Sequence, residues 1–203
     1  MPQENSYSQI SQDVFVLNFF ERKTGSFVDL GCGNGFNYPC GNNTLLLEQN
    51  GWFGLSVDID KKSVDHFNKN RNTKAIACDL TENDLAVILD KIDAPKIIDY
   101  LSFDVDQASE SVLAKLPLAN YTFRLVTFEH NAYLRNEMYK TLKDNAKKRF
   151  LSNGYEILVE DVILDGHGPV EDWFIHTDST LNFPKKFLKN INHKTVLKEY
   201  GFV

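Results

Sequence analysis

The sequence predicts an α/β fold in which one open, mostly parallel sheet carries helices on both faces. Short apolar runs alternate with longer amphipathic segments five times between residues 26 and 153, and repeated strand–helix units form parallel sheets because each crossover helix packs back onto the sheet. Two further apolar runs, 155–160 and 171–176, are joined by the turn-rich DGHGP segment with no long helix between them. These runs predict a hairpin, which would make one edge strand antiparallel.

The elements follow in chain order from their apolar patterns. The N-terminal segment 1–21 is predicted to hold a helix, because Ile10, Val14, Leu17 and Phe20 recur at helical spacing. Strands are expected at 26–30, 52–59, 74–80, 96–105 and 122–130, and helices at 42–50, 61–70, 81–92, 108–116 and 134–153.

The ends of these helices carry recognisable signals. The predicted helix at 42–50 opens with an Asn and the one at 81–92 with Thr81, and both residues can act as N-caps. Gly154 stops the last long helix. The segment 183–203 is locally basic, and we interpret it as a solvated C-terminal tail. A substrate-facing or partner-binding segment is the alternative.

Composition limits the class of protein. A chain of 203 residues with 42% hydrophobic and 25% charged residues fits one globular domain over 1–203. A net charge of −6 disfavours nucleic acid and anionic membranes as partners. Cys32, Cys40 and Cys78 form no CxxC pair, which favours a reducing compartment. The polar N-terminus lacks a signal sequence, and no apolar run reaches the ~20 residues of a membrane span, so we expect a cytoplasmic protein.

The most informative stretch is FVDLGCGNG (27–35), where a strand runs into Gly31, Gly33 and Gly35 before a helix. Glycines at such a turn allow backbone N–H groups to approach a ligand closely. Ligands of open α/β sheets lie at the carboxyl ends of the strands, where this turn is expected. The loop therefore predicts a nucleotide-like cofactor, and a tight turn without a ligand is the alternative.

The residues around the loop select among cofactors. The dinucleotide pattern GxGxxG is broken, because Phe36 occupies the place of its third glycine. Asp29, two residues before Gly31, would repel a pyrophosphate. It suits a ligand that carries an ammonium group and a sulfonium, such as S-adenosylmethionine.

Acids also end the second and third strands. Asp58, with Ile59 beside it, follows the second apolar run and can accept hydrogen bonds from both ribose hydroxyls of an adenosine. Asp60 can instead cap the next helix. Asp79 can accept from the adenine amino group while Leu80 packs on the ring, and a plain N-cap is the alternative for Asp79.

Taken together, these residues resemble the class I, Rossmann-like S-adenosylmethionine-dependent methyltransferases, and more narrowly the FkbM-type methyltransferase family. The resemblance covers most of the chain between residues 8 and 175. The matching segments are the SQISQD opening helix, the glycine loop, NNTLLLEQNGWFGLSVD (42–58), IIDYLSFDVD (97–106) and EDWFI (171–175). The glycine loop is general to the superfamily, and SQxxQD, NTLLLE and GW-x-GL are the more specific motifs.

The resemblance implies a seven-stranded sheet, S-adenosylmethionine as methyl donor, and a small-molecule or sugar hydroxyl as acceptor. Carried over by position, Asp29 and the loop glycines would hold the methionine part, and Asp104 would lie beside the sulfonium. Asp58 would hold the ribose and Asp79 the adenine. Two departures concern the acceptor side: the loop NYPCGNN (37–43) is longer than expected, and DVDQASE (104–110) replaces the family's Asp-x-Glu-Gly-x-Glu.

Methyl transfer to a hydroxyl requires alignment of the acceptor and removal of its proton. Asp104 ends the fourth strand, and Glu129 and His130 end the fifth. These side chains are therefore expected to be neighbours at the mouth of the cofactor cleft. They could hold a divalent cation such as Mg²⁺. Alternatively, Asp104 and His130 act as catalytic residues, with His130 as general base, or Glu129 and His130 only bond to loop backbone.

Four classes of protein are compatible with a Rossmann-like fold. The sequence favours a methyltransferase acting on oxygen, and a non-catalytic cofactor- or partner-binding module of the same fold is the alternative. A nicotinamide-dependent oxidoreductase is disfavoured by the broken GxGxxG, and a nucleic-acid methyltransferase by the negative charge. The sequence predicts no oligomeric state.

Overall fold

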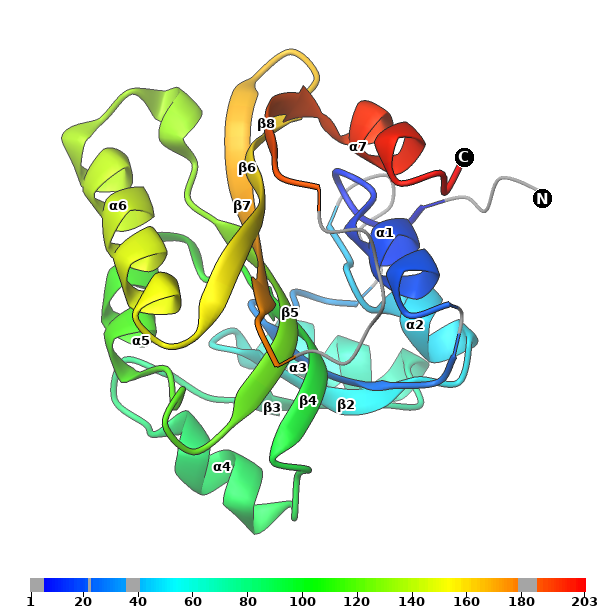
Figure 1. Cartoon of the computed structure of the whole chain (residues 1–203). Helices are drawn as coiled ribbons and strands as arrows, with labels where there is room; N and C mark the ends of the chain where they lie inside the picture. The colour runs from blue at the N-terminus through cyan, green and yellow to red at the C-terminus, as the bar shows by residue number, and fades with distance from the viewer. Residues whose placement is uncertain (1–5, 22, 36–40, 179–185) are drawn as a thin grey trace.

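The computed structural model describes residues 6–21, 23–35, 41–178 and 186–203. Its strands are β1 (Ser26–Leu30), β2 (Phe53–Asp58), β3 (Lys74–Ala77), β4 (Ile97–Phe103), β5 (Thr122–Glu129), β6 (Tyr155–Leu164), β7 (Gly168–His176) and β8 (Leu188–Asn192). They form one sheet in the order β3-β2-β1-β4-β5-β7-β6-β8 (Figure 1). The α/β architecture predicted from the apolar runs is confirmed.

Helices cover both faces of this sheet, as predicted. The helices are α1 (Gln12–Phe19), α2 (Leu45–Gln49), α3 (Lys61–Asn70), α4 (Leu85–Lys91), α5 (Ser109–Lys115), α6 (Glu137–Leu151) and α7 (His193–Glu199). One apolar core lies under α1, α2 and α7, and a second lies under α4, α5 and α6 (Figure 1). Among the described residues, no helix is both long and apolar enough to cross a bilayer.

The strand directions refine the prediction. The strands β1 to β5 pair in parallel, because each is followed by a crossover helix. The predicted hairpin supplies the antiparallel strand, β7, which pairs with β5 on one side and with β6 on the other. This strand lies inside the sheet, because β6 and an eighth strand, β8, extend the sheet beyond it.

The C-terminal segment is not the solvated tail that its basic composition predicted. Residues 188–199 form β8 and α7, and Val196 and Leu197 are buried against α1. Its lysines form ion pairs within the chain: Lys186 with Glu199, Lys189 with Glu160, and Lys194 with Asp165. The basic character is thus largely compensated locally. Residues 183–185 lie outside the described part.

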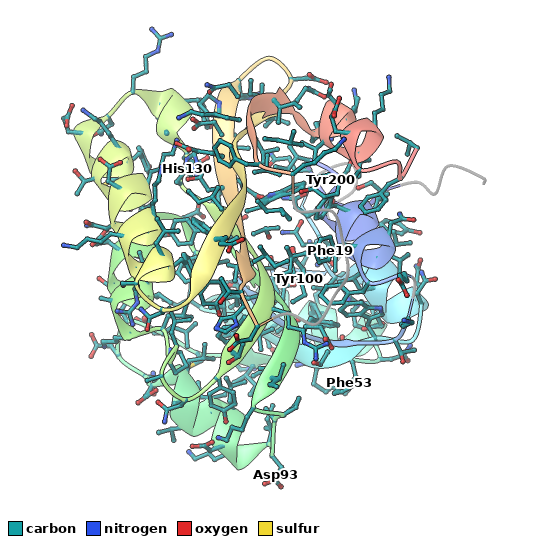
Figure 2. All side chains as sticks on the ribbon, viewed as in Figure 1. Phe19, Phe53, Asp93, Tyr100, His130 and Tyr200 are labelled. Atoms are coloured by element: carbon teal, nitrogen blue, oxygen red, sulfur yellow. The ribbon has the colours of Figure 1, made fainter. Side chains whose placement is uncertain are left out.

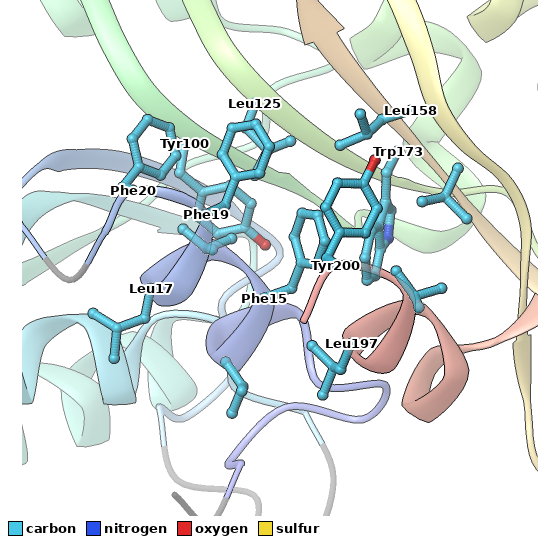
Figure 3. Packing of buried hydrophobic residues seen from close by; sticks show 14 of the residues in the cluster. Phe15, Leu17, Phe19, Phe20, Tyr100, Leu125, Leu158, Trp173, Leu197 and Tyr200 are labelled. Carbon is cyan, nitrogen blue, oxygen red and sulfur yellow. The ribbon is translucent and has the colours of Figure 1, made fainter. Parts of the chain in front are cut away.

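Helix α1 is buried on all sides, since all eight of its residues are buried. The Phe15 ring packs against Trp173 and Tyr200, with centroid distances of 4.6 Å and 5.2 Å, respectively (Figure 3). Each buried aromatic ring contributes about 2–3 kcal/mol through removal of its surface from water. Trp173 is therefore a core residue, and these contacts anchor α1 to the sheet.

The polar residues of the N-terminal SQISQD motif hold the segment before α1 in place. The Asp13 carboxylate accepts hydrogen bonds from the hydroxyls of Ser6 and Ser8 and from the amides of Tyr7 and Val14. Burial raises the pKa of Asp13, although these hydrogen bonds oppose that shift. Residues 6–11 are thereby fixed close to the carboxyl ends of the central strands.

Candidate cofactor and acceptor site

The glycine turn leaves β1 at the centre of the sheet, between β2 and β4. The amide of Gly31 donates to the Val57 carbonyl (2.8 Å), and the amide of Asp104 donates to the Leu30 carbonyl (2.9 Å). Gly31 has φ +84°, and a Cβ there would lie 1.5 Å from the Asp104 carbonyl oxygen. Only glycine fits this position, so the first glycine is required by the backbone itself.

The acid at the end of β2 is tied to the same turn. One carboxylate oxygen of Asp58 accepts from the Gly33 amide (2.8 Å), and the other accepts from the Asp60 amide (2.8 Å). Each carboxylate oxygen keeps a further acceptor site. Asp60 caps α3 by accepting from the amides of Lys62 and Ser63, which confirms the capping alternative given for that residue.

A cavity of about 430 Å³ lies at these strand ends. It unites the following predicted site residues: Gly31, Gly33, Asp58, Ile59, Asp79, Leu80, Asp104 and Glu129. The other lining residues are Gln9, Gly41, Val57, Cys78, Val105, Asp106, Ala108 and Val112. Gln9 comes from the segment that Asp13 fixes, and the small or apolar ones carry no chemical signal.

Asp79 is not a helix N-cap, which was the alternative to its role as adenine acceptor, and Thr81 is not one either, because α4 begins at Leu85. Its Oδ1 accepts from the amide (2.8 Å) and the hydroxyl (2.6 Å) of Thr81, which forms a turn and lowers the Asp79 pKa. The helix α4 begins later and is capped by Asp84. Within the described residues, no hydrogen bond is recorded for Oδ2 of Asp79.

Two predicted cofactor residues are not among the described residues that line the cavity. Asp29 is buried, and its carboxylate accepts from the Thr44 hydroxyl (3.0 Å). Burial raises its pKa, and its hydrogen bond to Thr44 joins β1 to the start of α2. A Cβ on Gly35 would lie 2.7 Å from the Phe67 ring, so Gly35 permits close packing of α3. Phe36 and the first four residues of the 37–43 loop lie outside the described residues.

The carboxylates of Asp104, Asp106 and Glu129 gather at one end of the cavity. One oxygen from each lies within 4.8 Å of the others. The register of β4 and β5 pairs Phe103 with Phe128, which brings the next residue of each strand together. Burial, and then the hydrogen bond and charge that Asp104 and Glu129 share, raise the Asp104 pKa, and burial raises the Glu129 pKa.

His130 does not join these carboxylates, which corrects its predicted place in the metal site and as the general base. Figure 2 shows it on the α6 side of the sheet, where its ring is buried next to Asp172. The Ala132 amide donates to Nδ1 (3.1 Å), so the ring hydrogen resides on Nε2 and points to Asp172 (3.3 Å). Both ring nitrogens are thus engaged away from the cavity.

Glu171, a buried carboxylate that the sequence analysis missed, lies beside the half-buried Asp104 and Glu129. It pairs with Glu129 across β5 and β7, and it accepts from the side chains of Gln12 (2.7 Å) and Trp173 (2.8 Å). Burial raises its pKa to about 7. Gln12, Glu171 and Trp173 belong to the SQxxQD and EDW motifs of the sequence. Gln12 and Glu171 are 159 residues apart in the chain, so no local pattern predicts their contact.

A larger cavity, about 680 Å³, lies at the other end of the sheet. It is lined by residues at the amino ends of β1 and β2 and after α4, among them Phe27, Trp52, Phe53 and Ile92. None of the predicted site residues lines it. Ligands of open α/β sheets bind at the carboxyl ends, so the smaller cavity is the candidate site.

The fold is similar to solved methyltransferases. A TehB-like SAM-dependent methyltransferase from Corynebacterium glutamicum has 14% identity and a TM-score of 0.54, over 82% of this chain and 88% of that chain. The magnesium protoporphyrin IX methyltransferase of Synechocystis, solved with bound SAM, has 14% identity and a TM-score of 0.57, over 83% and 79%. An O-methyltransferase from Bacillus cereus, solved with SAH, has 10% identity and a TM-score of 0.55, over 86% and 84%.

Sequence comparison adds nothing to this likeness: no protein-family model and no curated protein matches the chain. At 10–14% identity the similarity concerns the fold. The chain therefore has the Rossmann-like methyltransferase fold.

Proposed function

We propose that this chain is an S-adenosylmethionine-dependent methyltransferase that acts on a hydroxyl oxygen of a small-molecule or carbohydrate acceptor. One observation carries the proposal: a single cavity joins the glycine turn, Asp58 and Asp79 to the Asp104–Glu129 pair. The solved neighbours with SAM and SAH support the choice of cofactor. The FkbM-type resemblance supports it further through its motifs.

The lining residues fit the parts of S-adenosylmethionine. Gly31 and Gly33 line the cavity without a side chain, so a ligand can approach the backbone of the turn there. Asp58 has acceptor sites left for ribose hydroxyls, and Oδ2 of Asp79 for the adenine amino group. Leu80 and Val112 supply apolar surface. The bound cofactor would supply an electrophilic methyl group.

Asp104 and Glu129 are the groups that would manage the acceptor's proton. Burial and mutual repulsion favour one shared proton between them. The ionised member can then accept the proton of a hydroxyl that is placed in line with the methyl group.

A divalent cation is the second way to activate the hydroxyl. Three carboxylates with oxygens within 4.8 Å of one another offer the ligands that Mg²⁺ prefers. In that case Asp104, Asp106 and Glu129 would hold the ion, and the ion would lower the pKa of the acceptor hydroxyl.

A cytoplasmic location is supported by the free cysteines Cys32 and Cys78.

The test is calorimetric titration of the full chain with S-adenosylhomocysteine, S-adenosylmethionine and NAD, each with Mg²⁺ and with EDTA. Binding of both adenosyl ligands without NAD binding supports the proposal. Loss of adenosyl binding in Asp58→Ala locates that binding in the cavity. Absence of adenosyl binding overturns the proposal. Transfer activity that EDTA leaves unchanged overturns the role of a cation.

A further inference from the structure

We propose that the methyl acceptor carries a positively charged amino group. This group sits in a further cavity, between α5 and α6, which is called the second cavity below to set it beside the cofactor cavity of about 430 Å³. This inference rests on the methyltransferase function proposed above and names the chemistry of its acceptor. It is carried by the position of the second cavity, by the charges that line it, and by the aromatic and apolar side chains beside them.

The second cavity adjoins the cofactor cavity. It has a volume of about 370 Å³ and is lined by Asp106, Gln107, Glu110, Glu137, Met138, Tyr139, Thr141 and Leu142. Asp106 lines both cavities. Asp106 is also within 4.8 Å of the carboxylates of Asp104 and Glu129, so an acceptor that fills the second cavity and extends past Asp106 would bring its hydroxyl to that pair.

The lining charges all have one sign. Asp106, Glu110 and Glu137 line the second cavity, and within the described residues no Lys, Arg or His lines either cavity. Glu110 accepts from the neutral Asn145 amide (2.9 Å). Lys140 lies 3.9 Å from Glu137, but both side chains are mostly exposed, so solvent screens this pair.

Asp106 is the residue whose charge is least compensated. It is exposed and lies with the carboxylates of Asp104 and Glu129 in a group whose oxygens are within 4.8 Å. Among the described residues, no hydrogen bond or ion pair is recorded for its side chain. Like charges at this separation repel by about 1–3 kcal/mol near a protein surface. An ammonium group placed beside Asp106 replaces that repulsion with attraction.

The remaining lining fits the body of an organic amine. Tyr139 is half-buried, and Met138 and Leu142 lie beside it in the lining. Aromatic faces attract cations through the ring quadrupole, and the apolar side chains favour a hydrocarbon or aromatic body. An acceptor with a phosphate or carboxylate would instead lose its hydration against three carboxylates, which disfavours anions.

Three matched probes isolate the amino group: tyramine, 4-ethylphenol and 3-(4-hydroxyphenyl)propionate. They share the phenolic hydroxyl and differ in carrying a positive, neutral or negative group. Their affinities are measured by NMR titration of the full chain saturated with S-adenosylhomocysteine. We expect tyramine to bind at least about 10-fold more tightly than 4-ethylphenol, the propionate to bind most weakly, and salt to reduce the preference.

Variants locate the preference in the cavity. Asp106→Asn and Glu137→Gln should each reduce the tyramine preference several-fold, whereas Asp144→Asn should leave it unchanged, because Asp144 is an exposed residue of α6 that does not line the cavity. Equal affinities for the three probes overturn the inference, as does a preference that survives both cavity variants. Mg²⁺ binding that Asp106→Asn abolishes, without any amine preference, also overturns it in favour of a cation site. Failure to bind S-adenosylhomocysteine overturns the proposed function itself.

Discussion

The Asp58 carboxylate accepts a hydrogen bond from the Gly33 amide at 2.8 Å. This bond joins the end of β2 to the glycine turn after β1, so the group expected to hold the ribose also shapes the turn expected to hold the methionine part. A single change at Asp58 should therefore affect both halves of the cofactor site.

Asp58→Asn is expected to weaken S-adenosylhomocysteine binding by at least about 10-fold. An amide keeps one acceptor oxygen and replaces the other by an NH2 donor, so it cannot accept from the Gly33 amide, the Asp60 amide and both ribose hydroxyls at once. The affinity is measured by calorimetry, and circular dichroism checks that the fold is retained.

The matched control is Asp60→Asn. Asp60 lies two residues further along and caps α3, and it does not line the cavity. Its replacement should leave the affinity for S-adenosylhomocysteine within about two-fold of the original. Equal losses of affinity in the two variants would contradict the assignment of Asp58 to the cofactor.

Gly31→Ala is expected to abolish cofactor binding and to lower stability more than Gly166→Ala. Both glycines have similar φ values, +84° and +81°, and the left-handed conformation costs a non-glycine residue about 1–2 kcal/mol. Only at Gly31 would the new Cβ also meet the Asp104 carbonyl, whereas Gly166 has nothing within 4 Å. Thermal unfolding of both variants separates the clash from the backbone cost, and equal losses would contradict the close approach.

Features that depend on neighbouring residues were predictable from the sequence. The bounds of β1 and α3 match the predicted ranges 26–30 and 61–70, because alternation and caps are local. The positions of Asp58, Asp79 and Asp104 at strand ends followed from the strands themselves. Once the sheet was correctly inferred to be parallel, these ends had to lie at one edge.

Features that depend on distant segments were not predictable. Glu129 and His130 are adjacent in sequence, but successive residues point to opposite faces of a sheet, so His130 reaches Asp172 instead of the cavity. The basic C-terminal segment folds because Val196 and Leu197 pack against apolar residues of α1 and β6. Composition does not reveal this contact. Composition therefore predicted a tail where tertiary packing forms β8 and α7.

Glu171→Gln is expected to stabilise the protein increasingly as the pH rises. Burial raises the Glu171 pKa from 4.5 to about 7, so the folded state disfavours the ionised form. The carboxyl's contribution to stability is fully present below pH 4.5 and is lost as the pH rises through about 7. Glutamine carries no such loss, so the free energy of unfolding of the variant relative to the original should increase by about 3 kcal/mol from about pH 4 to about pH 8.

The change with pH, and not the absolute difference, is the measured quantity for Glu171→Gln. Replacing one carboxylate oxygen by an amide group disturbs the hydrogen bonds from Gln12 and Trp173, and that cost is constant with pH. Urea unfolding at a series of pH values gives the free energies. A difference that does not vary with pH would contradict the raised pKa.

His130→Ala is expected to destabilise the fold by about 2–4 kcal/mol while S-adenosylhomocysteine affinity stays within about two-fold. The imidazole is buried and donates to Asp172, whose other oxygen, Oδ2, has no partner recorded among the described residues. Loss of the ring leaves that buried carboxylate with fewer donors, whereas the cavity loses nothing.

Glu129→Gln should behave in the opposite way, because Glu129 lines the cavity. Methyl transfer should fall by about 100-fold or more, with little change in thermal stability. If His130→Ala instead abolished transfer in a folded protein, the separation of His130 from the chemistry would be wrong.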